Sequence, residues 1–435
     1  MTERLLQYIW QFQYYNKGEL TTTEGESLQI VNPGQFNTNQ GPDFLDGQIR
    51  IDITLWAGSI ELHINSSDWR NHKHSEDKNY NNVILHVVWK HDIALRLPFP
   101  TLVLEDRVPK ILLDKYDELM HSPGFIPCEK TIHKVEEIKL LSWKERLLVE
   151  RLEGKSKQIF DFLQQNQHHW EETFWWLLAR NFGARLNTDA FEKVARSLPV
   201  STLSKHKSQP IQLEALLFGQ AGLLEKKFEE SYPIMLRKEF RFLKKKYQLK
   251  PINEPIKFLR MRPSNFPTIR LAQLAMLVHQ SVHLFSTIKA ATSLDEIKNL
   301  LNITANDYWH YHYVFDETTA FKKKHLGSQM RDTILVNAVV PILFAYGLHN
   351  KENSIKEKAI DWLTMITAEK NLLTEGFTAI GVENKNAFDS QALIHLKKEY
   401  CDRRRCLECR INPVKPPQTP PKEGLPNTPR IQKKL

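Results

Sequence analysis

The stretch between residues 39 and 77 carries the densest set of side chains that can hold a metal ion. Glu61 and His63 flank Leu62, and Asp43 follows a Gly-Pro dipeptide eighteen residues before Glu61. Side chains two residues apart in a strand share one face, so Glu61 and His63 should project together, and a hairpin partner could bring Asp43 beside them. Two carboxylates and the Leu62 carbonyl make an oxygen-rich site suited to Mg²⁺ or Mn²⁺. Such an ion would polarise a phosphodiester and lower the pKa of a bound water.

Further ligand candidates surround this motif. The imidazoles and carboxylates after His63 could bind a transition metal such as Zn²⁺ or Mn²⁺, or they could contact a phosphate. Asp68 could instead cap a turn above Trp69, and His86 could be a hydrogen-bonded histidine of a buried strand. A carboxylate near the N-terminus, Glu3 or Glu24, could add a ligand. The auxiliary candidates are therefore Glu24, Asp68, His72 and His74.

The four cysteines suggest a second metal site. Cys401, Cys406 and Cys409 lie within nine residues, a spacing at which thiolates can share one ion, and Cys128 is the only other cysteine. Four cysteines are too few for a disulfide scaffold in 435 residues. Zinc and an iron–sulfur cluster both fit the ligand count, and unlinked thiols are the alternative. Neighbouring arginines should lower the pKa of these thiols.

The net charge of +9 is concentrated in two segments. Residues 235–270 hold eleven basic residues against two acidic ones, and residues 410–435 hold six against one. A basic helix face binds phosphates in a salt-dependent way, although such runs are often only solvated. Arg262 and Arg270 could instead form internal ion pairs. The nucleic-acid-binding candidates are Arg237, Lys238, Arg241, Lys244, Lys245, Arg260 and Arg262.

The elements that must position these residues change in type along the chain. The first 95 residues show a helix over 2–12, strands over 27–31, 47–55 and 58–64, a helical turn or two over 74–82, and a buried strand over 83–89. The strands over 47–55 and 58–64 should form a hairpin around a tight turn. The predicted order is α-β-β-β-α-β.

From about Lys134 onward the apolar residues recur at helical spacing. Seven helices are predicted, over 140–165, 170–182, 212–218, 231–247, 269–285, 333–346 and 354–366. The proline-rich end has too little apolar surface to fold. We therefore predict an α/β plus α protein with a domain over 1–130, a mostly α-helical domain with the cysteine cluster over 131–410, and a disordered tail over 411–435.

Several motifs together resemble known families. The α-β-β-β-α-β order with Pro-Asp and Glu-x-His resembles the PD-(D/E)xK nuclease superfamily over about residues 1–95. That resemblance implies a restriction-endonuclease-like fold, with Asp43 and Glu61 as metal ligands and His63 in the place of the usual lysine. The motifs GPDF, GSIELH, SSDWRNHKH, VILHVVW, RPSNFPTIRLAQLA and YCDRRRCLEC resemble the bacterial DUF2851 family over nearly the whole chain.

The composition limits the possible functions. With 41% hydrophobic and 26% charged residues, the chain is neither disordered nor fibrous. The apolar run over 334–348 is shorter than a membrane span and should be a buried helix, and no signal sequence is evident, so we expect a cytoplasmic protein without a membrane partner. The leading hypothesis is a metal-dependent phosphodiesterase acting on DNA or RNA, and the alternative is a non-catalytic nucleic-acid-binding or assembly protein.

Overall fold

The computed structural model describes residues 1–37, 39–259, 261–281 and 283–411. The chain divides into two compact units: residues 1–140 together with the chain from Lys397, and residues 141–396. The helical domain expected from the sequence includes the cysteine-bearing end, whereas contacts group the described residues 397–411 with the first unit. The predicted disordered tail lies, apart from Ile411, outside the described residues.

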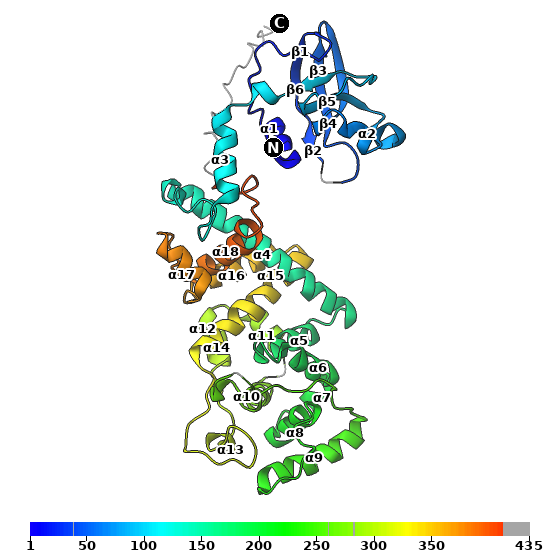
Figure 1. Ribbon diagram of the computed structural model, residues 1–435. Coiled ribbons are helices and arrows are strands. Elements are labelled where there is room, and N and C mark those ends of the chain that lie inside the picture. The colour runs from blue at the N-terminus through cyan, green and yellow to red at the C-terminus, as the bar shows by residue number, and fades with distance from the viewer. Residues whose placement is uncertain (38, 260, 282, 412–435) are drawn as a thin grey trace, which may run out of the picture. The chain divides into compact units, whose positions relative to one another are not determined.

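A mixed six-stranded sheet forms the centre of the first unit, in the order β1-β3-β4-β5-β6, with β2 paired to β3 (Figure 1). β1, β3 and β4 are antiparallel neighbours, whereas β4, β5 and β6 run parallel. The predicted mixture of sheet and helices is therefore confirmed for this unit. The strands are β1 (Leu28–Asn32), β2 (Gln35–Phe36), β3 (Phe44–Ile51), β4 (Thr54–Asn65), β5 (Val83–Lys90) and β6 (Thr101–Val103).

Helix α1 (Glu3–Gln11) covers one face of this sheet. Its N-cap Thr2 accepts a hydrogen bond from the Leu5 amide, as the predicted helix start requires. Ile60 and Leu62 of β4 belong to the same core cluster as the buried face of α1. Because side chains alternate along a strand, Glu61 and His63 point to the opposite face.

Short irregular segments cover that opposite face between β4 and β5. They are α2 (Asp68–Asn71), η1 (His74–Glu76) and η2 (Lys78–Tyr80). The last two lie within the helical turns predicted over 74–82, whereas α2 precedes them. Lys73 has a left-handed backbone with φ of 57°, which separates α2 from η1. The remaining elements of the unit are η3 (Glu105–Arg107), α3 (Lys110–His121), η4 (Ile132–Lys134) and the π-helical turn η7 (Leu396–Cys401), of which only Leu396 precedes the unit boundary.

The β3–β4 hairpin turns at a different place from the one predicted. The turn lies at Asp52 and Ile53, between the paired residues Ile51 and Thr54, whereas the sequence suggested a break just before Gly58. Asp52 adopts φ of 49°, a conformation that aspartate tolerates well. Gly58 lies inside β4, where a Cβ would come within 2.5 Å of the Asn82 carbonyl oxygen. This glycine permits close approach of the chain that enters β5.

The second unit is helical, and all seven predicted helices fall on observed ones (Figure 1). The single helix predicted over 269–285 corresponds to two helices, because α10 ends at Gln280 and α11 begins at Leu284. The helices are α4 (Glu137–Gln165), which begins just before the unit boundary, α5 (Trp170–Phe182), α6 (Thr188–Ser197), α7 (Val200–Ser204), α8 (Pro210–Gln220), α9 (Ser231–Tyr247), η5 (Pro263–Asn265), α10 (Pro267–Gln280), α11 (Leu284–Ala290), α12 (Leu294–Leu300), α13 (Asp307–His310), α14 (Ser328–Ile334), η6 (Leu335–Val339), α15 (Val340–Asn350), α16 (Asn353–Thr364), α17 (Leu372–Ala379) and α18 (Ala387–His395).

The most apolar helical stretch, Ser328–Asn350, contains the π-helical turn η6. By length and composition alone it could cross a membrane, but 67% of its most apolar window is buried inside the protein. Such burial is typical of a core helix, and the prediction of a buried helix is confirmed.

A buried carboxyl group in α8 makes the stability of the helical unit depend on pH. Glu214 is fully buried and accepts hydrogen bonds from Tyr232 Oη at 2.8 Å and Trp309 Nε1 at 3.0 Å, and also from Asn306. Burial raises the pKa of Glu214 to about 7. The folded protein therefore holds this proton more tightly than the unfolded chain, whose carboxyl group has a pKa of 4.5.

We expect the free energy of unfolding to fall as pH rises from about 5 to 7, because ionisation of Glu214 is unfavourable only in the folded state. The full effect of this group is about 3 kcal/mol. Denaturant unfolding of the wild type and of Glu214→Gln across this range measures it, since the variant should lack that part of the pH dependence. Equal slopes in the two proteins would contradict the assignment.

Candidate metal centre

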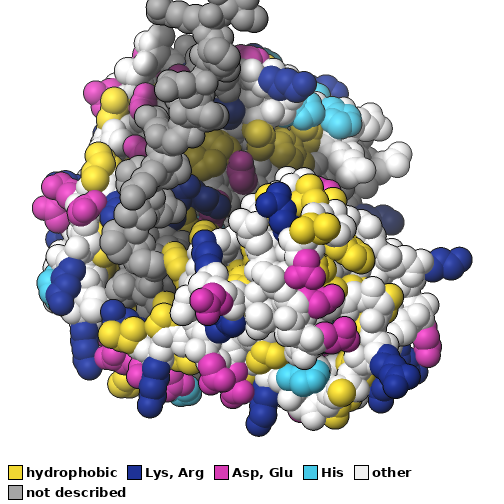
Figure 2. All heavy atoms as spheres, turned by 90° about the horizontal axis from the view of Figure 1, so that it is seen from above, with side chains coloured by type: hydrophobic (Ala, Val, Ile, Leu, Met, Phe, Trp, Pro, Cys, Tyr) yellow, Lys and Arg dark blue, Asp and Glu magenta, His cyan; other side chains and the backbone are white. Residues whose placement is uncertain are grey.

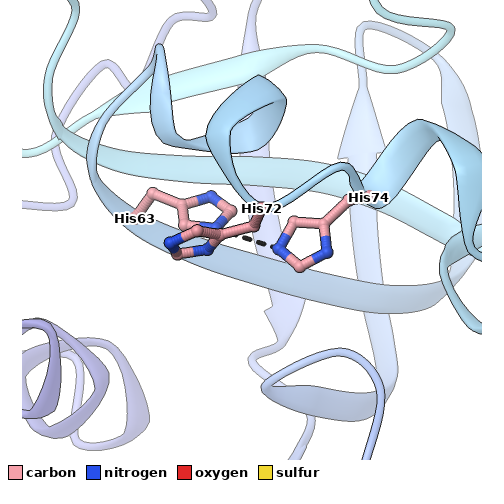
Figure 3. A group of neighbouring side chains, drawn as sticks. All are labelled: His63, His72 and His74. Atoms are coloured by element: carbon pink, nitrogen blue, oxygen red, sulfur yellow. Dashed lines mark hydrogen bonds between the residues drawn. The ribbon is translucent and has the colours of Figure 1, made fainter.

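Three imidazoles of the first unit converge on one point. His63 comes from β4, His72 follows α2 and His74 begins η1, and one nitrogen of each lies within 4.8 Å of the others. His63 Nε2 is 3.1 Å from His72 Nδ1 and 3.2 Å from His74 Nε2. Figure 3 shows the three rings turned toward one another.

The Glu61 carboxylate lies beside this group, next to two of its three imidazoles. Its Oε1 atom lies 3.6 Å from His63 Nε2 and 3.4 Å from His74 Nε2. Ligand atoms about 2.0–2.1 Å from a tetrahedral ion are separated by about 3.4 Å. A single proton on His63 Nε2 cannot satisfy three neighbours, whereas one cation can contact the three imidazoles, with Glu61 as a further candidate ligand beside His63 and His74. The spacing therefore fits one metal ion.

Two neighbours fix the orientation of the candidate ligands. His63 Nδ1 is 2.9 Å from His86 Nε2, and Glu61 pairs with His86 in the β4–β5 ladder. A metal-binding histidine usually donates its second ring N–H to such a partner, which fixes the tautomer. The Asp43 amide donates to Glu61 Oε2 at 3.0 Å, so Oε1 is left to face the imidazoles. Asp43 and His86 are thus placed as positioning residues.

The electrostatics of this site favour a bound cation. Burial raises the pKa of Asp43 and of Glu61, and the charge of Asp43 raises the pKa of Glu61 further. Burial lowers the pKa of His63 to about 2 and of His86 to about 4, so both imidazoles are neutral, the form that binds metals. Without a cation, the raised pKa keeps Glu61 protonated at neutral pH, and the charge of a bound ion would lower the pKa of both carboxyl groups and favour their carboxylate forms.

Aromatic side chains hold the imidazoles in place. Trp69, 3% exposed, packs edge-on against His63, His74 and His86. Tyr80 stacks on His74 with ring centroids 3.9 Å apart. His72 is exposed, so the site is reached from solvent on that side. The arrangement is a buried metal-binding geometry with one accessible edge.

The other predicted ligands are placed differently. The Leu62 amide, rather than its carbonyl, contacts Asp43, donating to Oδ2 at 3.1 Å. Asp68 does not cap α2 as its N-cap; it is the first residue of the helix, and its carboxylate accepts from the Asn65 amide at 3.0 Å. Glu3 raises the pKa of both Asp43 and Glu61, which places it beside them, whereas no contact among the described residues links Glu24 to the site.

The sequence indicated Glu3 of α1 as a possible ligand, but not Gln7, a second α1 residue at this site. Gln7 donates from Nε2 to Asp43 Oδ1 at 2.7 Å. Glu3 and Gln7 lie one helical turn apart, so they share one face of α1. That spacing, beside the buried face of Leu6 and Ile9, was the available signal.

The four cysteines meet within the first unit. All four line one cavity of about 20 Å³ between the end of α3 and the chain after η7. Cys401 and Cys409 are buried, and Cys128 and Cys406 are partly buried. The distant Cys128 is therefore brought to the other three, as the shared-site hypothesis requires.

The expected effect of the arginines is found for one thiol, that of Cys406, and burial outweighs it there. Burial, together with the other thiols, raises the pKa of Cys401, and burial raises the pKa of Cys128 to about 11. Arg404 instead donates to the Leu119 and Ser122 carbonyl oxygens, and Arg405 pairs with Glu408. Arg404 lowers the pKa of Cys406 only in part, because burial still raises it. Arg404 and Arg405 therefore bind mainly carbonyl oxygens and Glu408 instead of the thiols.

The predicted basic face lies on α9. Leu236, Phe240 and Leu243 are buried, and Lys238, Arg241 and the three lysines from Lys244 to Lys246 are exposed, with no ion pair to any described carboxylate. Arg237 is partly buried and donates to the Lys226 carbonyl oxygen at 2.8 Å. Arg262 is exposed, and Arg260 lies outside the described residues. On the surface that Figure 2 shows, by contrast, Lys and Arg are interspersed with Asp and Glu.

Comparison with known proteins identifies a family for this chain. A family model described as protein of unknown function (DUF2851) matches residues 3–372. No curated protein and no solved structure matches the chain.

Proposed function

The chain belongs to the DUF2851 family of proteins of unknown function, and we propose that it is a divalent-metal-dependent phosphodiesterase that acts on DNA or RNA. The observation that carries this proposal is the convergence of His63, His72 and His74 on one point, with the Glu61 carboxylate beside His63 and His74. A divalent ion there would polarise a phosphodiester oxygen and lower the pKa of a bound water. The order of elements and the β3–β4 hairpin support a variant of the restriction-endonuclease-like fold.

The ligand set favours Zn²⁺ or Mn²⁺ over Mg²⁺. Three imidazole nitrogens and one carboxylate suit a transition metal, whereas Mg²⁺ prefers oxygen ligands and retains several waters. His63 thus acts as a ligand in this proposal and does not replace the lysine that positions water. Asp43, first expected as a ligand, holds Glu61 in orientation through its amide.

The basic face of α9 supports nucleic acid as the substrate. Its exposed lysines and Arg241 carry charge without described carboxylate partners, which leaves them available to phosphates. The cytoplasmic location and the absence of a membrane partner stay predictions.

A second function, a structural metal site in a non-catalytic protein, is favoured by one observation. Glu61 and His63 are 5% and 0% exposed, and four protein ligands would fill a tetrahedral ion completely. Structural zinc sites are closed in this way, whereas catalytic sites keep a position for water. The exposed edge at His72 is the side from which a substrate would reach the ion.

Cleavage assays separate these two functions. We expect purified protein loaded with Mn²⁺ or Zn²⁺ to cut at least one of a panel of labelled single- and double-stranded DNA and RNA substrates, and Mg²⁺ alone to support little cutting. The matched control is the same protein carrying His72→Ala. Tight metal binding without cleavage of any substrate would leave the structural function.

The cysteine cavity fits a single structural ion in this proposal. Its volume of about 20 Å³ is close to that of one bound water, and a four-iron cluster with its sulfides needs more space. Four thiolates around one Zn²⁺ form a closed structural site. Zinc is therefore favoured over an iron–sulfur cluster.

A further inference from the structure

The helical unit contains a cavity of about 710 Å³ whose charged lining is basic. Its volume lies within the range of about 300–1,000 Å³ that is common for small-molecule sites. No Asp or Glu is found among its described lining residues, and the motif over 262–270 contributes to its wall. The lysines and arginines that line it are Lys155, Arg180, Arg185, Arg270, Lys322, Lys323 and Lys324.

Arg270 is a buried cation whose hydrogen-bond partners are uncharged. It is 6% exposed and donates from Nη1 to Gln273 at 2.8 Å and from Nη2 to Asn265 at 2.5 Å. Its Nε atom is buried and has no hydrogen-bond partner in the part of the chain that the structure describes. The sequence left open an internal ion pair, but among the described residues its partners are neutral amides. A buried guanidinium normally has an anion to compensate its charge. The lining therefore has a cationic group without an anionic partner.

Two lysines repeat this arrangement on other walls of the cavity. Lys324 is 4% exposed and contacts only carbonyl oxygens, those of His310 at 3.5 Å and Lys322 at 3.1 Å, and the Tyr313 ring. Lys155 is partly buried and donates to Asn337 Oδ1 at 2.9 Å. Neither lysine forms an ion pair with a described carboxylate. Burial lowers the pKa of both groups, and for Lys155 the charge of Glu369 offsets this only in part.

The wall of the cavity also includes part of a π-helical turn. The π-helical turn η6 contains Val336 and Asn337, and Lys155 Nζ contacts the Val336 carbonyl oxygen at 3.3 Å as well as the Asn337 side chain. Single π-helical turns inside helices often occur at binding sites. Arg180 differs from the other cations, because Asp189 and Glu192 pair with it.

We propose that this cavity binds a compact phosphorylated ligand of nucleotide size. One cavity is surrounded by cations from three segments: Lys155 of α4, Arg270 of α10 and the lysines of residues 322–324. Lysine and arginine side chains donate charge-assisted hydrogen bonds to phosphate oxygens. Arg270 and Lys324 are too buried to contact a nucleic-acid backbone that lies across the surface, so the phosphate group must enter the cavity. This site does not depend on the proposed phosphodiesterase activity.

Calorimetric titration of the full-length protein tests the proposal. Pyrophosphate, ATP and a 5′-phosphorylated oligonucleotide are the probes, and the protein carries His72→Ala so that the candidate metal centre does not contribute. We expect saturable one-to-one binding of ATP and a rise in the thermal midpoint of the protein. Absence of saturable binding by all three probes would overturn the proposal, and binding of the oligonucleotide alone would overturn the small-ligand assignment.

Three variants assign the binding to the cavity. Arg270→Gln and Lys155→Gln should each weaken ATP binding about 10- to 100-fold, the usual effect of losing a hydrogen bond to a charged group. Lys322→Gln with Lys323→Gln, both exposed at the cavity, tests the same charge without a risk to folding. Lys245→Gln on α9 is the matched control and should bind as the parent does. Equal affinity in all of these proteins would overturn the assignment.

Discussion

Replacing His72 by Ala should lower the affinity of the first unit for Zn²⁺ or Mn²⁺ by about 100-fold or more, and should abolish metal-dependent cleavage. Loss of a residue that only orients a ligand typically costs about 10- to 100-fold in metal affinity, and His72 is proposed as a ligand itself. His72 is exposed, so its truncation leaves the buried side of the site in place. Metal titration by calorimetry and the cleavage assay measure the two effects.

Comparison with other histidine variants makes this test specific. His91 is also exposed but belongs to no described metal-binding cluster, so His91→Ala is the matched control and should retain both properties. His86→Gln should show an intermediate loss, because His86 contacts His63 Nδ1 and not the ion. If His72→Ala binds metal as tightly as His91→Ala, the proposed ligand set is incorrect.

Replacing Cys401 by Ser should remove one metal ion per chain and destabilise the first unit by several kcal/mol. Binding of a structural zinc supplies about 10 kcal/mol or more in small zinc-dependent folds, and folding and binding are coupled. The cavity lies between the end of α3 and the chain after η7, and these two segments are distant in the sequence. Without the ion, the hydrogen bonds from Arg404 to the Leu119 and Ser122 carbonyl oxygens would still join these segments, but the four thiols would no longer share a ligand that ties them together.

Elemental analysis and thermal unfolding check this prediction. We expect about two metal ions per wild-type chain, and Cys401→Ser and His72→Ala should each lose a different one. Arg403→Gln, an exposed neighbour that pairs with Glu399, is the control and should keep both ions. Metal-free protein with unchanged unfolding after chelation would show that the cysteines are only packed thiols.

Local sequence information was sufficient for most elements. Period-two alternation placed Glu61 and His63 on one face of β4, because every second side chain of a strand points the same way. Helical recurrence located α4, α5 and α9, where long amphipathic stretches leave little choice of structure. The hairpin turn was misplaced because Gly58 reads as a turn signal, although its role is to admit the neighbouring chain.

The assembled sites depend on contacts that no local signal encodes. His72 and His74 reach His63 only because the left-handed residue Lys73 and the packing of Trp69 fold an irregular segment over β4. The sequence identified these residues as candidates without fixing which atoms meet. It therefore favoured an oxygen-rich Mg²⁺ site, whereas the geometry favours a nitrogen-rich one.

From the sequence alone came the residue types: a carboxylate and histidine motif on a strand, four cysteines, a basic helix and a change from sheet to helices near residue 134. Tertiary structure alone decided that Cys128 joins the other cysteines and that Lys155, Arg270 and Lys324 line one cavity. The physical reason is the range of the interactions. Backbone periodicity acts over a few residues, whereas ligand geometry and charge compensation depend on distances between segments that only the packed core brings together.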